Sequence, residues 1–133
     1  MTAPADPAPD LRPGQRWAYP ARPGEDKSRA VILKVEDLPP AGRVAHVAVE
    51  GVRIPGVPAA ADGTTRIAHM PYDADALVGC LTAHAGDGPV PDFADGYAEW
   101  RAAFDRGEAG VWTAPIAVAV DGMAAAVAGG GAG

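Results

Sequence analysis

The sequence has few of the residues that build most catalytic sites. It contains one cysteine, Cys80, and one serine, Ser28, in 133 residues. A single cysteine excludes an intramolecular disulfide and fits a reducing compartment. The only serine lies outside any G-x-S-x-G motif, and the phosphate-binding motifs G-x-x-x-x-G-K-[ST] and G-x-G-x-x-G are missing. The sequence therefore predicts no serine nucleophile and no cofactor.

Long basic and long apolar runs are also missing. Eleven Lys and Arg residues stand against 17 Asp and Glu, and the basic residues are scattered. Binding to phosphate backbones requires clustered basic residues, so we expect no nucleic-acid partner. No segment approaches the roughly 18 consecutive apolar residues of a membrane helix. The first ten residues alternate Pro, Ala and Asp, unlike a signal peptide. We expect a cytoplasmic protein that binds no membrane.

The length and the 48% hydrophobic content are enough for one domain with its own core. Four prolines within residues 1–14 predict a flexible N-terminal arm. The glycine-rich residues 129–133 predict a flexible tail, because glycine loses the most backbone entropy on ordering. Residues 15–128 are then the folded domain.

The first half of this domain has the pattern of β-strands. Residues 29–36 alternate, with Val31, Leu33 and Val35 predicted on one face. Residues 43–54 are rich in valine, and shorter candidate strands lie at 17–19 and 65–70. Short turns between neighbouring strands predict an antiparallel meander of about four strands. An SH3-like barrel is an alternative form of the same sheet.

Three stretches of the second half have apolar residues at helical spacing. The first follows Asp73, a candidate N-cap, and runs to Gly86. The second ends at Gly107 and carries an aromatic stripe, which we assign to the core rather than to a pocket: Phe93, Tyr97, Trp100 and Phe104. The third follows Pro115. Strands followed by helices predict an α+β fold with three helices on one face of the sheet.

Two histidines stand out in the predicted strands. If His46 and His69 share a face of the sheet, a carboxylate such as Asp73 or Glu50 would complete a three-ligand metal site or the site of a small enzyme. Two histidines hydrogen-bonded at sheet edges are the alternative. A metal site formed by His46, His69 and Asp73 is therefore a hypothesis that depends on the register in which the strands pair.

Two further groups of residues are candidates for chemistry or recognition. Cys80 and His84 stand four apart on the first predicted helix, where a thiolate–imidazole pair is possible. Neighbouring leucines favour a packed, inert thiol instead. The strand connection at 22–29 predicts a binding surface on a loop, carried by four side chains: Arg22, Glu25, Lys27 and Ser28.

Two sequence blocks resemble a set of small uncharacterised bacterial proteins of about 130 residues. The first follows the pattern W-x-Y…R-x-G-E…S between Trp17 and Ser28, and the second is GYAEWRAAFDRGEAGVWT at 96–113. The resemblance spans about residues 14–123. It implies a bacterial, cytosolic, single-domain protein, and it assigns no activity, ligand or catalytic residue.

Together these patterns favour a small, acidic, non-enzymatic module that binds another protein, as an inhibitor or an antitoxin does. The alternative is a metal-binding protein or enzyme that uses His46, His69 and Asp73. A homodimer is compatible with the sequence, because periodicity does not separate a self-association patch from a packed face.

Overall fold

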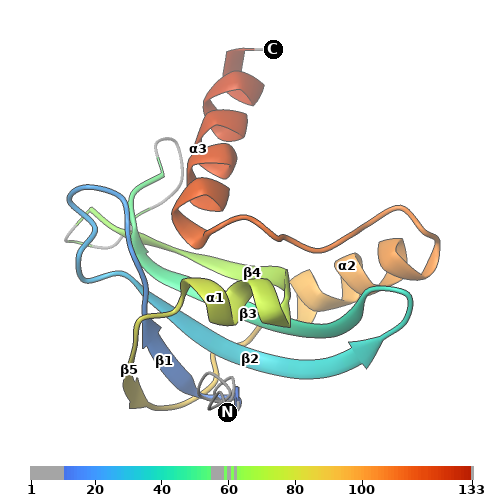
Figure 1. Cartoon of the computed structure of the whole chain (residues 1–133). Coiled ribbons are helices and arrows are strands. Elements are labelled where there is room, and N and C mark those ends of the chain that lie inside the picture. Colours follow the sequence, from blue (N-terminus) through green and yellow to red (C-terminus); the bar gives the residue numbers. More distant parts are fainter. Residues whose placement is uncertain (1–10, 55–58, 60, 62, 133) are drawn as a thin grey trace, which may run out of the picture.

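A computed structural model describes residues 11–54, 59, 61 and 63–132, and shows an α+β fold on one open antiparallel sheet. The sheet has five strands in the order β4-β3-β2-β1-β5 (Figure 1). They are β1 (Gln15–Ala18), β2 (Arg29–Leu38), β3 (Gly42–Val52), β4 (Thr65–Asp73) and β5 (Ala83–Asp87). Because β4 and β5 are its two edges, the sheet is not closed into an SH3-like barrel.

The long hairpin of β2 and β3 is the centre of the sheet, and it is buried on both faces. Ile32 of β2 and Val47 and Val49 of β3 belong to the main core. A smaller cluster on the opposite face contains Val31, Leu33 and Ala48 with Phe93 packed on it. A register shift between Ile32 and Lys34 changes the alternation, so Val35 packs with the main core. The prediction that Val31, Leu33 and Val35 share one face is wrong.

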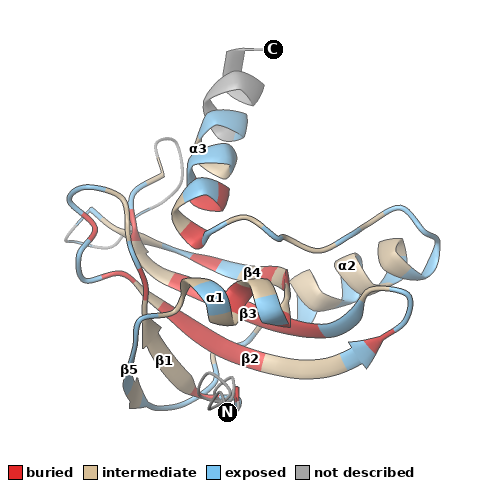
Figure 2. Cartoon of the chain, viewed as in Figure 1, coloured by how far each residue is buried: buried red, intermediate tan, exposed pale blue. Residues whose placement is uncertain are grey.

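Helices α1 (Ala74–Cys80) and α3 (Ile116–Ala132) cover the main-core face. Leu77 of α1 and Ile116 and Val120 of α3 are fully buried there. Figure 2 shows buried residues in the first turns of α3, next to the sheet, whereas residues 121–126 are exposed or intermediate. The three helices of the prediction are present, and the first of them is shorter than expected.

Helix α2 (Ala94–Asp105) lies on the opposite face of the sheet, behind it in Figure 1. Phe93, which precedes the helix, packs on the smaller cluster, and no residue of α2 is fully buried. The expectation that all helices lie on one face is therefore wrong. It failed because β2 and β3 carry apolar residues on both faces, and each face needs a cover.

The fifth strand replaces the second half of the first predicted helix. Helix α1 ends at Cys80, and Leu81 is extended. Thr82 donates its N–H to the carbonyl of Ala18, and β5 then pairs with β1. Without β5, strand β1 would be an edge with unpaired backbone groups. Pairing these groups outweighs the helical spacing of the side chains. Cys80 and His84 consequently lie on different elements.

Residues 1–10 and 133 lie outside the described part of the chain, so most of the predicted arm is not described. Leu11 is buried in the main core, and Gly14 donates its N–H to the carbonyl of Ile32. Residues 11–14 thus pack against the sheet. Of the predicted tail, residues 129–132 belong to α3. No helix within the described residues is long and apolar enough to cross a membrane.

Gly51 in β3 provides a test of the packing between strands. Its φ is +75°, and an added Cβ would lie 3.1 Å from the Cα of Ser28. Gly51→Ala should lower the free energy of unfolding by about 1–3 kcal/mol, because it combines left-handed backbone strain with a clash. Urea unfolding measures this.

Gly79→Ala is the matched control. Gly79 lies inside α1 with no atom near its would-be Cβ, so alanine should stabilise by about 0.5–1 kcal/mol. Equal effects of the two substitutions would contradict the close approach at Gly51.

Candidate functional site

Three neighbouring strands bring Glu36, His46 and His69 together on the face that α2 covers. The Nε2 atom of His46 lies 2.8 Å from Oε2 of Glu36. The Nδ1 atom of His46 lies 2.9 Å from Nε2 of His69. His46 is 0% exposed, so both of its ring nitrogens find their partners inside the protein. His46 and His69 therefore lie on the same face of the sheet and are in contact.

The carboxylate fixes the direction of these hydrogen bonds. An ionised Glu36 can only accept, so His46 donates its Nε2–H to it. A neutral His46 then has a lone pair on Nδ1, which accepts the Nε2–H of His69. In this arrangement Nδ1 of His69 carries no proton.

Helix α2 contributes the remaining side chains of the cluster. The hydroxyl of Tyr97 donates to Oε2 of Glu36 at 2.8 Å. The rings of Tyr97 and Trp100 meet the His46 ring edge-on, with centroids 4.9 and 5.1 Å away. We call Glu36, His46, His69 and Tyr97 the histidine network.

Gly96 lets the helix come this close to the sheet. A Cβ at that position would lie 3.1 Å from the Cβ of His69. The Phe93 ring stacks on His69 with centroids 6.4 Å apart. The aromatic stripe predicted from the sequence therefore faces the sheet, where it packs on polar rings as well as on the apolar cluster.

Burial sets the protonation of the network. Burial lowers the pKa of His46, against the opposing effect of Glu36. Burial, followed by the neighbouring His46, lowers the pKa of His69 to about 4. For Glu36, burial alone would raise the pKa, but the hydrogen bonds from Tyr97 and His46 outweigh it and lower the pKa. At neutral pH the network holds a charged carboxylate and two neutral imidazoles.

Asp73, the third residue of the predicted metal site, lies elsewhere. Its carboxylate accepts from the N–H of Ala76 at 2.9 Å and caps α1. No group of three His, Cys, Asp or Glu side chains within the described residues is arranged to hold a metal ion. The carboxylate that reaches the histidines is Glu36, which the sequence analysis did not select. A metal site at His46 and His69 stays a prediction.

A hollow of about 390 Å³ opens beside the network, between β2 and the start of α2. Seven residues line it: Lys34, Val90, Pro91, Asp92, Phe93, Ala94 and Tyr97. The Nζ atom of Lys34 lies 5.1 Å from the centre of the Tyr97 ring. Val90 is one of two large hydrophobic residues that are exposed in the described part of the chain, with 40% of its surface accessible. We call this site the Lys34 hollow; neither histidine lines it.

The predicted binding residues of the 22–29 connection divide into buried and exposed groups. The carboxylate of Glu25 is buried and accepts from the Arg22 guanidinium and from the N–H of Arg53. Ser28 is buried and donates its hydroxyl to the carbonyl of Glu50 at 2.6 Å. These bonds hold the connection against β3. Lys27 is exposed and lines a hollow of about 540 Å³, and a binding surface there stays a prediction.

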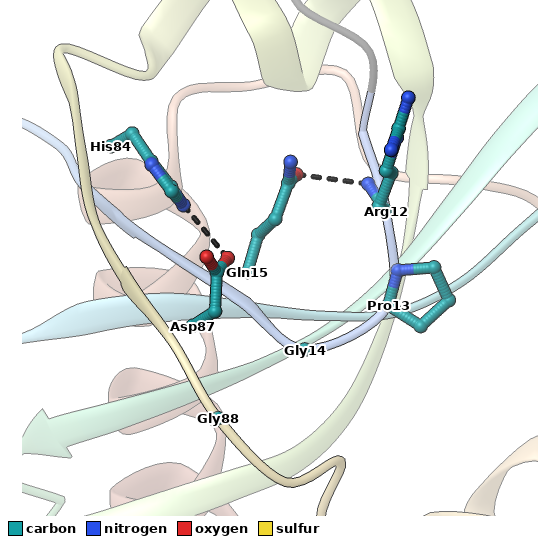
Figure 3. Close-up of a pocket in the computed structure, with 7 residues that line it drawn as sticks. All are labelled: Arg12, Pro13, Gly14, Gln15, His84, Asp87 and Gly88. Carbon is teal, nitrogen blue, oxygen red and sulfur yellow. Dashed lines mark hydrogen bonds and ion pairs between the residues drawn. The ribbon is translucent and has the colours of Figure 1, made fainter.

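Cys80 and His84 do not form a pair. The thiol of Cys80 packs against the main core and donates to the carbonyl of Leu77 at 3.2 Å, and burial raises its pKa. His84 and Asp87 instead point toward one another at an open hollow of about 480 Å³, with 2.9 Å between Nε2 and Oδ1 (Figure 3). Both side chains are largely exposed, and among the described residues no serine, threonine, cysteine or lysine lines that hollow.

Comparisons of the chain with protein-family models, with curated proteins and with solved structures find no match. The likeness to small bacterial proteins therefore stays a prediction.

The lowered pKa of His69 predicts an acid-sensitive fold. The unfolded chain, with an ordinary histidine pKa of about 6.5, binds more protons than the folded chain between pH 6.5 and 4. The free energy of unfolding should therefore fall across this range as the pH drops. We expect a loss of about 1–3 kcal/mol, reduced by solvent at this half-buried site.

His69→Gln tests the assignment, because glutamine keeps a donor for His46 but does not titrate. Urea unfolding between pH 7 and pH 4 should show a shallower loss of stability in this variant than in the wild type. Parallel pH profiles for the two proteins would contradict it.

Proposed function

We propose that the protein is a non-enzymatic binding module that recognises another protein through the Lys34 hollow and the exposed start of α2. The observation that carries this proposal is that a largely apolar hollow opens beside the histidine network, whose side chains are hydrogen-bonded to one another. Tyr97, whose hydroxyl donates to Glu36, lines the hollow, and Glu36 and the two histidines do not.

The hydrogen bonds of the network support a structural role. Every buried side-chain nitrogen and oxygen among the described residues has a hydrogen-bond partner. Fully satisfied polar networks hold packed elements in one arrangement, while unpaired groups are costly. Here the network positions Tyr97 and with it the wall of the hollow.

The hollow has the features of a recognition site. It is lined mainly by apolar and aromatic side chains with few charged groups, as protein-binding pockets are. Val90 at this site is exposed, and covering it would remove apolar surface from water. Occupying a partner's surface is also how an inhibitor or antitoxin works, and this requires no catalytic group. We also propose that the protein is cytoplasmic.

A small enzyme that uses His69 as a base is the second candidate, supported by the alignment of Glu36, His46 and His69. In that order a carboxylate orients one imidazole, which orients the next. Three aromatic rings, those of Phe93, Tyr97 and Trp100, lie against the half-buried His69 ring and would narrow the approach of a substrate.

Two exposed valines allow a matched test of the binding surface. Val90→Asp places a charge at the hollow, and Val118→Asp places the same charge on α3, where Val118 is 56% exposed. Immobilised wild-type protein should capture a partner that is identified, purified and shown to bind directly. Val118→Asp should bind it as the wild type does, and Val90→Asp should bind it about tenfold more weakly or worse.

Two outcomes would count against the proposal. Val90→Asp could bind the partner as the wild type does, or both aspartate variants could lose it equally. Analytical ultracentrifugation of the wild type separates the case in which the captured partner is a second copy of this chain.

A further inference from the structure

Lys34 places an ammonium group at a hollow whose lining, apart from Lys34 and Asp92, is apolar or aromatic. Its Nζ atom faces the Tyr97 ring, and within the described residues Lys34 makes no ion pair. Glu36, two residues along β2, already accepts from His46 and Tyr97 and lies 3.6 Å from the Arg101 guanidinium. The ammonium of Lys34 therefore remains available to an anion that enters the hollow.

The other charged side chain of the hollow is Asp92. Its Oδ1 atom accepts the N–H of Ala94 at 3.0 Å, at the start of α2. This carboxylate has a structural partner and lies where the helix dipole favours a negative charge. Between the two charges the lining is apolar, formed by Val90, Pro91 and the Phe93 ring. The hollow thus offers one cation, an apolar wall and the Asp92 carboxylate, which accepts the N–H of Ala94.

The volume limits what can enter. About 390 Å³ is near the lower end of the roughly 300–1,000 Å³ range of ligand pockets. It has room for one apolar side chain and the carboxylate attached to it. At the carboxyl end of a polypeptide these two groups share one α-carbon, whereas along the middle of a chain the backbone would have to enter and leave.

We infer that the Lys34 hollow binds the carboxyl-terminal residue of a partner polypeptide when that residue has an apolar side chain. The inference rests on the proposed function and names the part of the partner that is recognised. The terminal carboxylate pairs with Lys34, and the side chain packs on Phe93 and Val90. Lysine acts here as a point charge, which sets no strict geometry on the carboxylate.

Three peptide probes and two lysine variants test this. The probes are acetyl-Gly-Ala-Leu with a free carboxylate, the same peptide as its amide, and acetyl-Gly-Ala-Gly with a free carboxylate. Lys34→Met removes the charge and keeps an unbranched stem, and Lys27→Met makes the same change on the exposed 22–29 connection. Binding is followed by ¹H–¹⁵N chemical shifts at Lys34, Val90, Phe93 and Tyr97.

The leucine acid should bind about tenfold more tightly than its amide, which lacks the charge, and more tightly than the glycine acid. Lys34→Met should abolish the preference for acid over amide, and Lys27→Met should retain it. Equal binding of acid and amide overturns the inference, as does an acid preference that survives in Lys34→Met. Absence of saturable shifts with all three peptides overturns it as well.

A small acid separates the two sources of this chemistry. If 4-methylpentanoate, which has leucine's side chain and a carboxylate, binds as tightly as the leucine peptide, the site takes free acids and the chain-end inference fails. The captured partner gives a second separation. If Lys34→Met still binds that partner while Val90→Asp does not, the binding module stands and the carboxylate inference falls.

Discussion

His46 is an imidazole with no access to water, and that constraint organises the face of the sheet on which α2 lies. A buried ring nitrogen without a partner costs about 1–3 kcal/mol, so both nitrogens of His46 require one. Glu36 from β2 and His69 from β4 supply them. Glu36, His46 and His69 thus come from three adjacent strands, and a slip of one residue in either pairing would leave His46 unsatisfied.

The position of α2 follows from the same constraint. The helix has no fully buried residue, so apolar burial alone gives it little hold on the sheet. It is held by the Tyr97 hydroxyl on Glu36 and by aromatic rings around the two histidines. Since Tyr97 belongs to the network and also lines the Lys34 hollow, the network and the proposed binding surface share this side chain. The histidine network on the sheet side of α2 thereby fixes one wall of the Lys34 hollow at the start of the helix.

Sequence reasoning predicted the α+β class and the strands that have clear alternation. The alternating residues 29–36 and the valine-rich residues 43–54 correspond to β2 and β3. It failed where long-range pairing decides the outcome. Residues 83–87 have helical spacing to Leu77, but they form β5 because β1 needs a partner. Val35 was assigned to the wrong face because a bulge between Ile32 and Lys34 is not visible in the pattern.

Only part of the site was predictable, because its contacts also depend on long-range pairing of strands. His46 and His69 were selected for their chemistry, but their contact depends on register shifts in β4 that no local signal indicates. Glu36 was overlooked because it looked like the solvent-facing residue of an alternating strand. Pairing β2 with β3 across the turn at 38–42 would have placed it two positions from His46 on the same face. Asp73 was correctly identified as an N-cap candidate, and that role explains why it is not with the histidines.

The most direct test of whether the network holds α2 to the sheet is amide hydrogen exchange in Glu36→Ala. This change leaves His46 with an unsatisfied donor and Tyr97 without its acceptor, while Glu99→Ala on the exposed side of α2 is the control. Amides of α2 should exchange about tenfold faster or more in Glu36→Ala, with a smaller change in the β2–β3 hairpin and none in Glu99→Ala. Unchanged exchange in α2, or an equal increase in α2 and the hairpin, would contradict the claim.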